Sequence, residues 1–466
     1  MNESFPSDQS PTTGSQATPL YTESATPLIQ SERVQIIDAL RGIALLGILL
    51  MNIPYFSLPF LTANDLRIRN EYSGINYYTW WTVSGFFEGT MRALFSMLFG
   101  AGSILLISRL EKKHGGTYPA DIYYRRLIWL LIFGLINAFI FLWVGDILYS
   151  YAICGLFLFP FRKMAPKYLF LFGIGLMLMM NLKNTLTLYE GKSNREKGEY
   201  AVALEKKKQK LTPEQKTDKE QYEARVERLK LANMKKEAAK EVAEFRKGYF
   251  SLMTYLKKIN VEIQSTVFYN NYFYDILAFF FFGMALFKLG VLTGHRSVQF
   301  YVLLSVIGYA VGLTLSYLIL RASVDVKFDR SYLADKLLFD FYDEKRLFIC
   351  LGHIGLLMTI YKLHIADWFF RMLSPVGQMA FSNYLMQSII CTLIYNGYGL
   401  RWFDAMQRYQ IYIVVAGIWI FQIIFSNIWL KYYRFGPFEW LWRSLTYWKL
   451  QPFARAEAGK PVMSYE

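Results

Sequence analysis

An aspartate and an arginine stand three residues apart where a long apolar run begins. Asp38 and Arg41 lie in the sequence Asp-Ala-Leu-Arg-Gly, and the apolar residues 43–53 follow directly. A charged side chain costs about 2.5–3.5 kcal/mol at the centre of a membrane helix, and less near the helix end or beside an opposite charge. The pair is therefore either an anchor at the membrane interface or part of a polar site covered by other helices.

A second apolar run carries Glu88, Arg92 and Ser96 at intervals of four residues. This spacing places the three side chains on one helix face, where we expect Glu88 and Arg92 to neutralise each other. Such a group is either an ion pair that fixes helix packing or part of a polar cavity that binds an anion.

Three further residues have two interpretations each. Asn137 lies inside an apolar run and either joins two helices or contacts a ligand. Asp146, in the short link Gly-Asp between two runs, either caps the following helix or belongs to a site. His353 is the one histidine within an apolar run, and it is either a hydrogen-bonded core residue or a general base.

A polar stripe runs along a later apolar segment. Gln378, Asn383 and Gln387 recur at roughly helical spacing, which predicts a lined polar cavity. We expect no metal site, because the three cysteines all lie in apolar runs without a ligand pattern. Phosphate-loop, dinucleotide and zinc motifs do not occur in the sequence.

The elements that must position these residues are membrane-spanning helices. The chain has 466 residues, of which 54% are hydrophobic and 18% aromatic. Apolar runs of the length that a bilayer requires of a helix recur along it, which predicts an all-α polytopic bundle of about ten transmembrane helices. The net charge of +15 then indicates basic loops beside anionic membrane lipids, and not nucleic-acid binding.

The predicted spans occupy about 36–58, 80–108, 127–144, 146–162, 168–188, 268–290, 297–320, 347–363, 376–397 and 410–432. We expect a disordered cytoplasmic tail over 1–32 and a five-span bundle over 33–188. A charged helical extracytoplasmic insert then occupies 189–260, a second bundle 261–450 and a cytoplasmic tail 451–466. The insert is either a solvated helical hairpin or a docking site, and Thr212 followed by Pro213 predicts a helix start within it.

Loop charge predicts the orientation. With the N-terminus inside, the short inner loops carry far more Lys and Arg than the short outer loops, as the positive-inside rule requires. Both termini then face the cytoplasm. Asp38 and Arg41 lie at the inner side and the link at Asp146 at the outer side.

Several of these motifs together resemble the YeiB-type family of bacterial inner-membrane proteins. The similar segments are 38–52, 94–102, 125–151, 377–388 and 434–443. The resemblance covers most of residues 33–450, leaves out the tail and the insert, and implies a location in the bacterial inner membrane.

What the resemblance implies about activity comes from the opening motif. Asp-x-x-Arg-Gly is similar to the opening of membrane acyltransferases that pass acyl groups to sugars, such as the heparan glucosaminide acetyltransferases. By that similarity Arg41 would steady an anionic acyl donor. The family often has His where this chain has Asn137, and an amide cannot accept a proton at neutral pH, so another residue would have to act as the base.

The first functional hypothesis is an acyltransferase-like protein without a bound cofactor. Acyl-CoA would be its co-substrate, a glycan or lipid-linked envelope molecule its acceptor, and Asp146 or His353 its catalytic base, with Asn383 and Gln387 as polar support. The alternatives are a transporter for a small anionic or lipid-linked solute, lined by Arg41, the Glu88–Arg92 pair and the later amides, and a scaffold without turnover. The sequence predicts no oligomeric state.

Overall fold

The computed structural model describes residues 35–455, so the predicted tail 1–32 and most of the tail 451–466 lie outside the described residues. The described chain is helical, with one isolated β-bridge between Tyr433 and Ala454, which confirms the all-α class. Six helical segments are long and apolar enough to cross a membrane: Gln35–Ser57, Gly74–Lys113, Tyr118–Phe139, Pro166–Lys206, Val298–Asp325 and Arg408–Tyr432. They indicate a membrane protein, whereas the count of ten spans is not confirmed.

The other predicted spans form shorter or more charged helices. α11 (Phe273–Lys288) and α15 (Ala380–Tyr395) have 16 residues each, fewer than the about 20 that span a bilayer without tilt. α13 (Tyr342–Lys362) is long enough, but its first turns carry four charged residues. The predicted span 146–162 folds as the nine-residue α6 (Leu148–Leu156) followed by a 3-10 turn.

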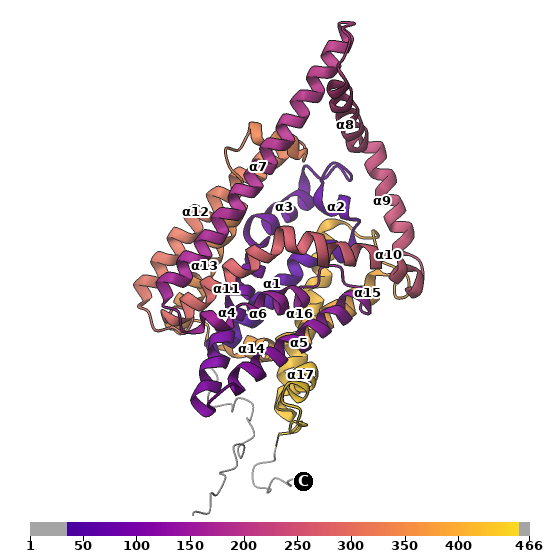
Figure 1. Cartoon of the computed structure of the whole chain (residues 1–466). Helices are drawn as coiled ribbons and strands as arrows, with labels where there is room; N and C mark the ends of the chain where they lie inside the picture. Colours follow the sequence, from indigo (N-terminus) through magenta and orange to yellow (C-terminus); the bar gives the residue numbers. More distant parts are fainter. Residues whose placement is uncertain (1–34, 456–466) are drawn as a thin grey trace, which may run out of the picture.

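The insert continues a membrane helix. α7 (Pro166–Lys206) runs for 41 residues without a break, so the expected boundary at residue 188 falls within it. α8 (Pro213–Leu229) begins with a capping box made by Thr212, as predicted. α9 (Leu231–Phe245) and α10 (Tyr249–Glu262) lead back to the bundle, and the insert projects from it as a tapering hairpin (Figure 1).

The predicted span 376–397 is broken at Met379. α14 (Asp367–Gln378) ends there and α15 begins at the next residue. The break leaves the first amide groups of α15 without a partner in their own helix, and Glu439 of α17 (Pro437–Tyr447) accepts hydrogen bonds from two of them.

Helices from both expected bundles pack into one body. α1 (Gln35–Ser57) contacts α14, α15 and α16 (Arg408–Tyr432), while α11 contacts α4 (Thr90–Lys113) and α7. A side chain at Gly377 would overlap the carbonyl oxygen of Asp38, so this glycine permits the close approach of α14 to α1.

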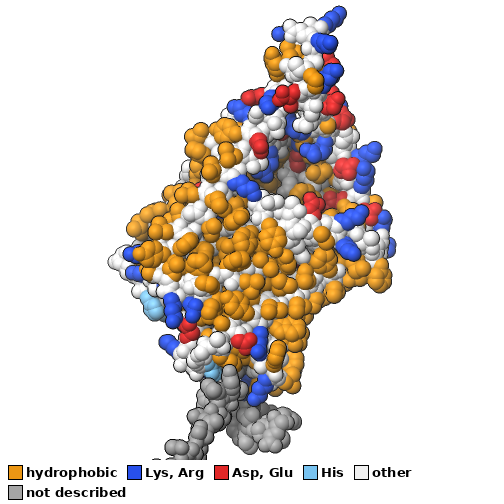
Figure 2. Space-filling view, in the orientation of Figure 1, with side chains coloured by type: hydrophobic (Ala, Val, Ile, Leu, Met, Phe, Trp, Pro, Cys, Tyr) orange, Lys and Arg blue, Asp and Glu red, His pale blue; other side chains and the backbone are white. Residues whose placement is uncertain are grey.

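Loops that were expected on the inner side meet at one end of the bundle. Arg162 pairs with Glu111 at 2.8 Å, and Lys288 donates to the carbonyl oxygen of Arg162 at 2.7 Å. Lys362 likewise donates to Arg296. The insert lies at the opposite end from α17 (Figure 1), and apolar side chains cover the broad surface between the two charged ends (Figure 2).

Candidate functional site

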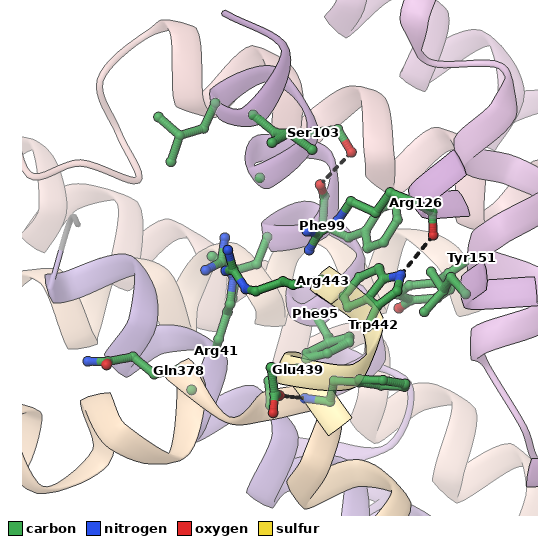
Figure 3. A pocket seen from close by; sticks show the side chains of 18 of the residues that line it. Arg41, Phe95, Phe99, Ser103, Arg126, Tyr151, Gln378, Glu439, Trp442 and Arg443 are labelled. Carbon is green, nitrogen blue, oxygen red and sulfur yellow. Dashed lines mark hydrogen bonds between the residues drawn. The ribbon is translucent and has the colours of Figure 1, made fainter. Parts of the chain in front are cut away.

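A cavity of about 230 Å³ lies at the α17 end of the bundle (Figure 3). Side chains of α1, α4, α5 (Tyr118–Phe139), α6, α14, α15 and α17 line it. Its charged lining residues are Asp38, Arg41, Arg109, Arg126, Glu439 and Arg443. Four cations and two anions therefore surround one small space.

Asp38 and Arg41 hold each other at the cavity wall. Arg41 Nη1 lies 2.9 Å from Asp38 Oδ1, and 26% of the Arg41 side chain stays accessible. Gly102 of α4 makes room for the guanidinium, because a Cβ atom at this position would lie 2.9 Å from Arg41 Nη2. The predicted pair is thus part of a covered polar site and not only an interfacial anchor.

Arg126 is held by an aromatic partner from α17. Its guanidinium stacks 3.8 Å from the centre of the Trp442 ring, and Trp442 Nε1 donates to the Arg126 carbonyl oxygen at 2.9 Å. Arg41 and Arg443 lie close enough to act on the Arg126 charge. Like charges repel each other across a low-dielectric site, so this arginine cluster favours a bound anion.

The second acid of the cavity, Glu439, is hydrogen-bonded to the start of α15, and its charge also acts on Arg126. Its carboxylate accepts hydrogen bonds from the backbone of Phe381 at 2.8 Å and Ser382 at 3.0 Å, and from the Ser382 hydroxyl. Burial raises the pKa of Glu439 above its ordinary value, while these hydrogen bonds act in the opposite direction. The role of Glu439 is to cap α15.

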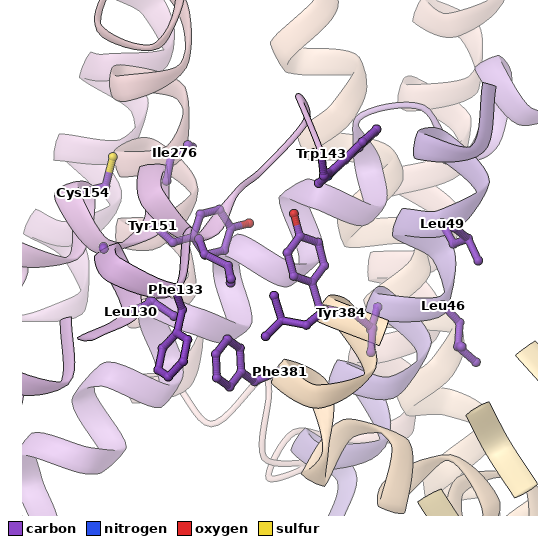
Figure 4. Packing of buried hydrophobic residues seen from close by; sticks show 14 of the residues in the cluster. Leu46, Leu49, Leu130, Phe133, Trp143, Tyr151, Cys154, Ile276, Phe381 and Tyr384 are labelled. Carbon is purple, nitrogen blue, oxygen red and sulfur yellow. The ribbon is translucent and has the colours of Figure 1, made fainter. Parts of the chain in front are cut away.

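The cavity also has apolar and aromatic lining residues, of which Leu130, Tyr151, Phe381 and Tyr384 belong to the buried hydrophobic cluster (Figure 4). The apolar and aromatic lining residues include Phe95, Phe99, Leu127, Leu130, Leu148, Tyr151, Phe381 and Tyr384. The hydroxyl of Tyr151 bonds with Ser96 at 2.6 Å, which places the predicted Ser96 directly behind the lining. The lining thus combines arginines with apolar and aromatic side chains, a combination that suits an amphiphilic anion.

Asp146 lies behind Tyr384, outside the lining itself. Its Oδ1 accepts from Asn137 Nδ2 at 2.8 Å and from the Tyr384 hydroxyl at 3.5 Å. Its Oδ2 accepts from the backbone of Tyr149 in the first turn of α6 at 2.9 Å. Asp146 therefore caps α6, one of its two predicted roles, and is separated from the cavity by one tyrosine side chain.

The structure does not bring His353 to the cavity. Its Nδ1 lies 2.7 Å from the Tyr309 hydroxyl and its Nε2 lies 3.0 Å from the carbonyl oxygen of Phe86. With both ring nitrogens engaged, this histidine joins α13 to neighbouring segments. The geometry favours the core role over that of a base.

The polar residues of the stripe 378–387 have two different roles, cavity lining and helix packing. Gln378 lines the cavity. Asn383 donates to the Ser426 hydroxyl at 2.9 Å, and Gln387 donates to Gln422 Oε1 at 3.0 Å. These two buried amides tie α15 to α16, so the expectation that the whole stripe lines a cavity is wrong.

The expected pairing of Glu88 with Arg92 is also wrong. Glu88 pairs with Lys345 at 2.8 Å and Arg92 with Asp275 at 3.1 Å. A π-helical turn, Val83–Phe87, and the left-handed Gly89 interrupt the helix just before Arg92, so the regular spacing of four is lost. Both residues lie toward the insert end, away from the Arg41 cavity.

Sequence reasoning missed the contributions of α5 and α17. In the sequence, Arg126, Trp442 and Arg443 stood out only as members of the segments 125–151 and 434–443 that resemble the family. The three aromatic residues at 438, 440 and 442, interspersed with Glu439 and Arg443, were an available signal. Within residues 35–455, no group of three or more His, Cys, Asp or Glu residues could hold a metal ion.

The comparisons with known proteins add a family model and three relatives. The model, described as a protein of unknown function (DUF418), matches residues 286–449, which include Gln378, Tyr384 and Trp442 of the cavity. The uncharacterized protein YxaH of Bacillus subtilis (strain 168) is 28% identical over 446 residues, which cover 93% of this chain and 98% of that protein.

The uncharacterized protein YeiB of Escherichia coli (strain K12) is 27% identical over 427 residues, which cover 89% of this chain and 96% of that protein. An uncharacterized 39.9 kDa protein of Bacillus acidopullulyticus is 26% identical, covering 90% and 96%. No solved structure gives a significant match. The similarity extends over nearly the full length of each relative, so the chain is similar to the YeiB-type proteins throughout, and its residues 286–449 match the DUF418 model.

Proposed function

We propose that this chain is an acyltransferase-like protein of the bacterial inner membrane that moves an acyl group from acyl-CoA to an envelope acceptor. One observation carries the proposal. A single cavity joins a cluster of arginines to an apolar wall, and a buried carboxylate, Asp146, lies one side chain behind that wall.

The arginine side of the cavity suits the phosphates of the donor. Guanidinium groups bind phosphate through paired hydrogen bonds, and Arg41 and Arg126 both line this side. The volume of about 230 Å³ is below the roughly 300–1,000 Å³ of a typical ligand pocket. We therefore expect the cavity to hold the acyl end of the donor, with its apolar chain against Leu130 and Phe381, while the nucleotide stays near the mouth.

The proton would pass to Asp146. In the proposed step the acceptor hydroxyl attacks the thioester carbon, the carbon–sulfur bond breaks, and CoA leaves as a thiolate that takes up a proton. Asp146 would accept the hydroxyl proton, held in place by Asn137 where the family often has His. Tyr384 separates Asp146 from the cavity and would have to turn aside or relay the proton.

The orientation follows from charge and agrees with this assignment. The loops rich in Lys and Arg gather at the end that holds the arginine cavity, and such loops face the cytoplasm in inner-membrane proteins. Acyl-CoA is a cytoplasmic molecule, so the donor would enter from that side. Both termini would then be cytoplasmic and the insert would be extracytoplasmic.

Acyl transfer from radiolabelled acetyl-CoA to membrane lipids and envelope glycans tests the proposal. We expect Arg41→Ala to abolish transfer while the protein still inserts into the membrane. Arg125→Ala is the matched control, because Arg125 pairs with Asp121 at 2.7 Å and does not line the cavity. Transfer at the wild-type rate by the Arg41 variant would overturn the donor site.

Transport of an anionic solute is the second candidate, and one feature favours it. The Tyr151 hydroxyl bonds with Ser96 on the cavity side and lies 3.3 Å from the Arg92 carbonyl oxygen. One side chain thus separates the Arg41 cavity from charged residues toward the other end, where ionisable groups often mark a solute path. A transporter gains nothing from acetyl-CoA, so solute uptake without binding of acyl-CoA would support this candidate instead.

A further inference from the structure

Helix α4 shows how far the Arg41 cavity extends into the bundle. Its lining residues run from Phe95 to Arg109, and no earlier residue of this fully described helix takes part. At a rise of about 1.5 Å per residue, Phe95 and Arg109 lie roughly 21 Å apart along the helix axis. Because α4 ends at Lys113, Arg109 marks the mouth of the cavity and Phe95 marks its inner end.

Arg41 and Tyr151 meet α4 at different depths. A Cβ atom at Gly102 would lie 2.9 Å from Arg41 Nη2, so the guanidinium lies beside this residue. The Tyr151 hydroxyl bonds with Ser96 at 2.6 Å. Gly102 and Ser96 are six residues apart in α4, which corresponds to about 9 Å along the helix axis. The Tyr151 hydroxyl therefore lies roughly that much farther into the cavity than the Arg41 guanidinium (both are labelled in Figure 3).

Tyr151 closes the inner end as a fixed side chain. Only 1% of Tyr151 is accessible. Its ring centre lies 5.3 Å from that of Phe99 and 5.1 Å from that of Phe280. Phe280 belongs to the buried hydrophobic cluster and is not among the residues that line the cavity, so packed side chains fill the space behind Tyr151. Protein interiors have few voids and low compressibility, so a ligand does not readily push this ring aside.

The depth of the cavity leaves room for a short chain only. A carbon atom in contact with Tyr151 lies about 4 Å from it, which leaves about 5 Å of the roughly 9 Å depth. An extended chain advances about 1.2 Å per bond, because the three backbone bonds of a residue span at most about 3.6 Å. About four carbon atoms therefore fit between Tyr151 and a group held by Arg41. The volume agrees, since a cavity of about 230 Å³ offers space for roughly eight groups of the size of a water molecule.

We propose that the cavity selects its ligand by chain length, and that Tyr151 sets the limit. The ligand binds Arg41 through an oxygen-bearing head group and carries an apolar chain of about four carbons or fewer. Tyr151 is then a specificity-determining residue that takes no part in the chemistry. The apolar lining residues Leu130 and Phe381 surround the chain.

For the proposed acyl transfer, on which this identification of the ligand rests, the limit names the donor class. The long pantetheine arm of CoA separates the phosphates from the thioester. The phosphates would therefore stay toward Arg109, while the thioester oxygen meets Arg41 and an acetyl to butyryl group reaches toward Tyr151. Acyl groups of the length found in membrane lipids would be excluded. The limit itself applies to any ligand whose polar end binds Arg41.

Isothermal titration of the purified full-length protein with two ligand series tests the limit. The series are linear acyl-CoA from acetyl to octanoyl and linear alkyl phosphates from ethyl to octyl. In each series we expect the affinity to increase about fourfold per added methylene up to the butyryl or butyl member. The octanoyl or octyl member should bind at least tenfold more weakly than that optimum. Tyr151→Ala should move the optimum to longer chains and tighten binding of the longest member at least tenfold.

Tyr123→Ala is the matched control. Tyr123 is also 1% accessible and lines the same cavity, and its hydroxyl donates to the carbonyl oxygen of Gly155 at 2.8 Å. Its partner on α4 is Ser103, so it lies nearer the mouth than Tyr151. Tyr123→Ala should keep the wild-type order of affinities within each series. If Tyr151→Ala does not fold, Tyr151→Leu keeps most of the packing and must still move the optimum to a longer chain.

The two series separate this inference from the proposed function. An optimum among the alkyl phosphates that moves in Tyr151→Ala, without binding of any acyl-CoA, would support the chain-length limit and overturn the proposed donor. Binding of acyl-CoA with equal affinity for all chain lengths, an unmoved optimum in Tyr151→Ala, or an equal movement in Tyr123→Ala would overturn the limit and leave the donor site standing. Absence of binding in both series would overturn both.

Discussion

Asn137 donates a hydrogen bond from Nδ2 to Asp146 Oδ1 at 2.8 Å, while its own Oδ1 is buried without a partner. Asn137 is fully buried and Asp146 is 8% accessible. The Asn137 side chain therefore donates to the carboxylate, while its carbonyl oxygen accepts no hydrogen bond. Asn137 thus positions the Asp146 carboxylate.

Removing this amide should destabilise the protein. Asn137→Ala leaves one oxygen of Asp146 with only the 3.5 Å contact to Tyr384, and an unsatisfied buried polar group costs about 1–3 kcal/mol. We expect a lower melting temperature in detergent. Asn427→Ala is the control, because the Asn427 amide donates to two backbone carbonyls and contacts no charged group. We expect a smaller decrease in its melting temperature. Equal losses would show that Asp146 does not depend on Asn137.

Gly102→Ala should weaken donor binding without unfolding the protein. The new Cβ atom would lie 2.9 Å from Arg41 Nη2, the far end of a flexible side chain that can move away. We expect a melting temperature close to that of the wild type and at least threefold weaker binding of acetyl-CoA. Gly175→Ala is the control on α7, because a Cβ atom there meets nothing within 4 Å. Unchanged affinity for acetyl-CoA would show that Arg41 does not contribute to donor binding.

The contact between the insert and α2 (Phe60–Asn64) should weaken as the pH rises. Burial, with a smaller effect of Asp404, raises the pKa of Glu241 in α9 to about 7, although a hydrogen bond from the Phe60 amide acts in the opposite direction. A carboxyl whose folded pKa is raised stabilises the fold fully below its unfolded pKa of about 4.3 and loses that contribution as the pH rises through 7.

Glu241→Gln, which stays uncharged, should therefore keep its melting temperature between pH 5 and 8, while the wild-type value falls. Exposed Glu237 on the same helix pairs with Lys240 at 2.6 Å, so Glu237→Gln serves as the control and should follow the wild-type pH dependence. Parallel curves for the wild type and the Glu241 variant would contradict the prediction.

Apolar runs predicted the spanning helices closely wherever lipid contact determines the pattern. The runs 36–58, 297–320 and 410–432 became α1, α12 (Val298–Asp325) and α16 with small shifts at their ends. Membrane insertion depends on apolar length, which is local in sequence. The break at Met379 could not be predicted in this way. Its free amide groups are capped by Glu439, which lies some 60 residues later in the sequence.

The partners of the charged residues were the least predictable part. Glu88 and Arg92 had the spacing of a helical ion pair, but each found a partner on another helix. The sequence singled out Arg41 and Asp146 as candidates, and the structure places Arg41 in the cavity lining and Asp146 beside the lining residue Tyr384. The sequence could not show that α17 folds against Arg126, because that contact joins residues 316 positions apart.

Direct binding of acetyl-CoA to the purified protein tests the central claim, that the arginine cavity receives an anionic acyl donor. Isothermal titration should compare the wild type with Arg126→Ala and with its neighbour Arg125→Ala. Loss of a charge-assisted contact of about 1.5–3 kcal/mol corresponds to roughly 10- to 100-fold weaker binding. We predict that loss for Arg126→Ala and wild-type affinity for Arg125→Ala. Absence of acetyl-CoA binding to the wild type, or equal affinities for all three proteins, would contradict the account.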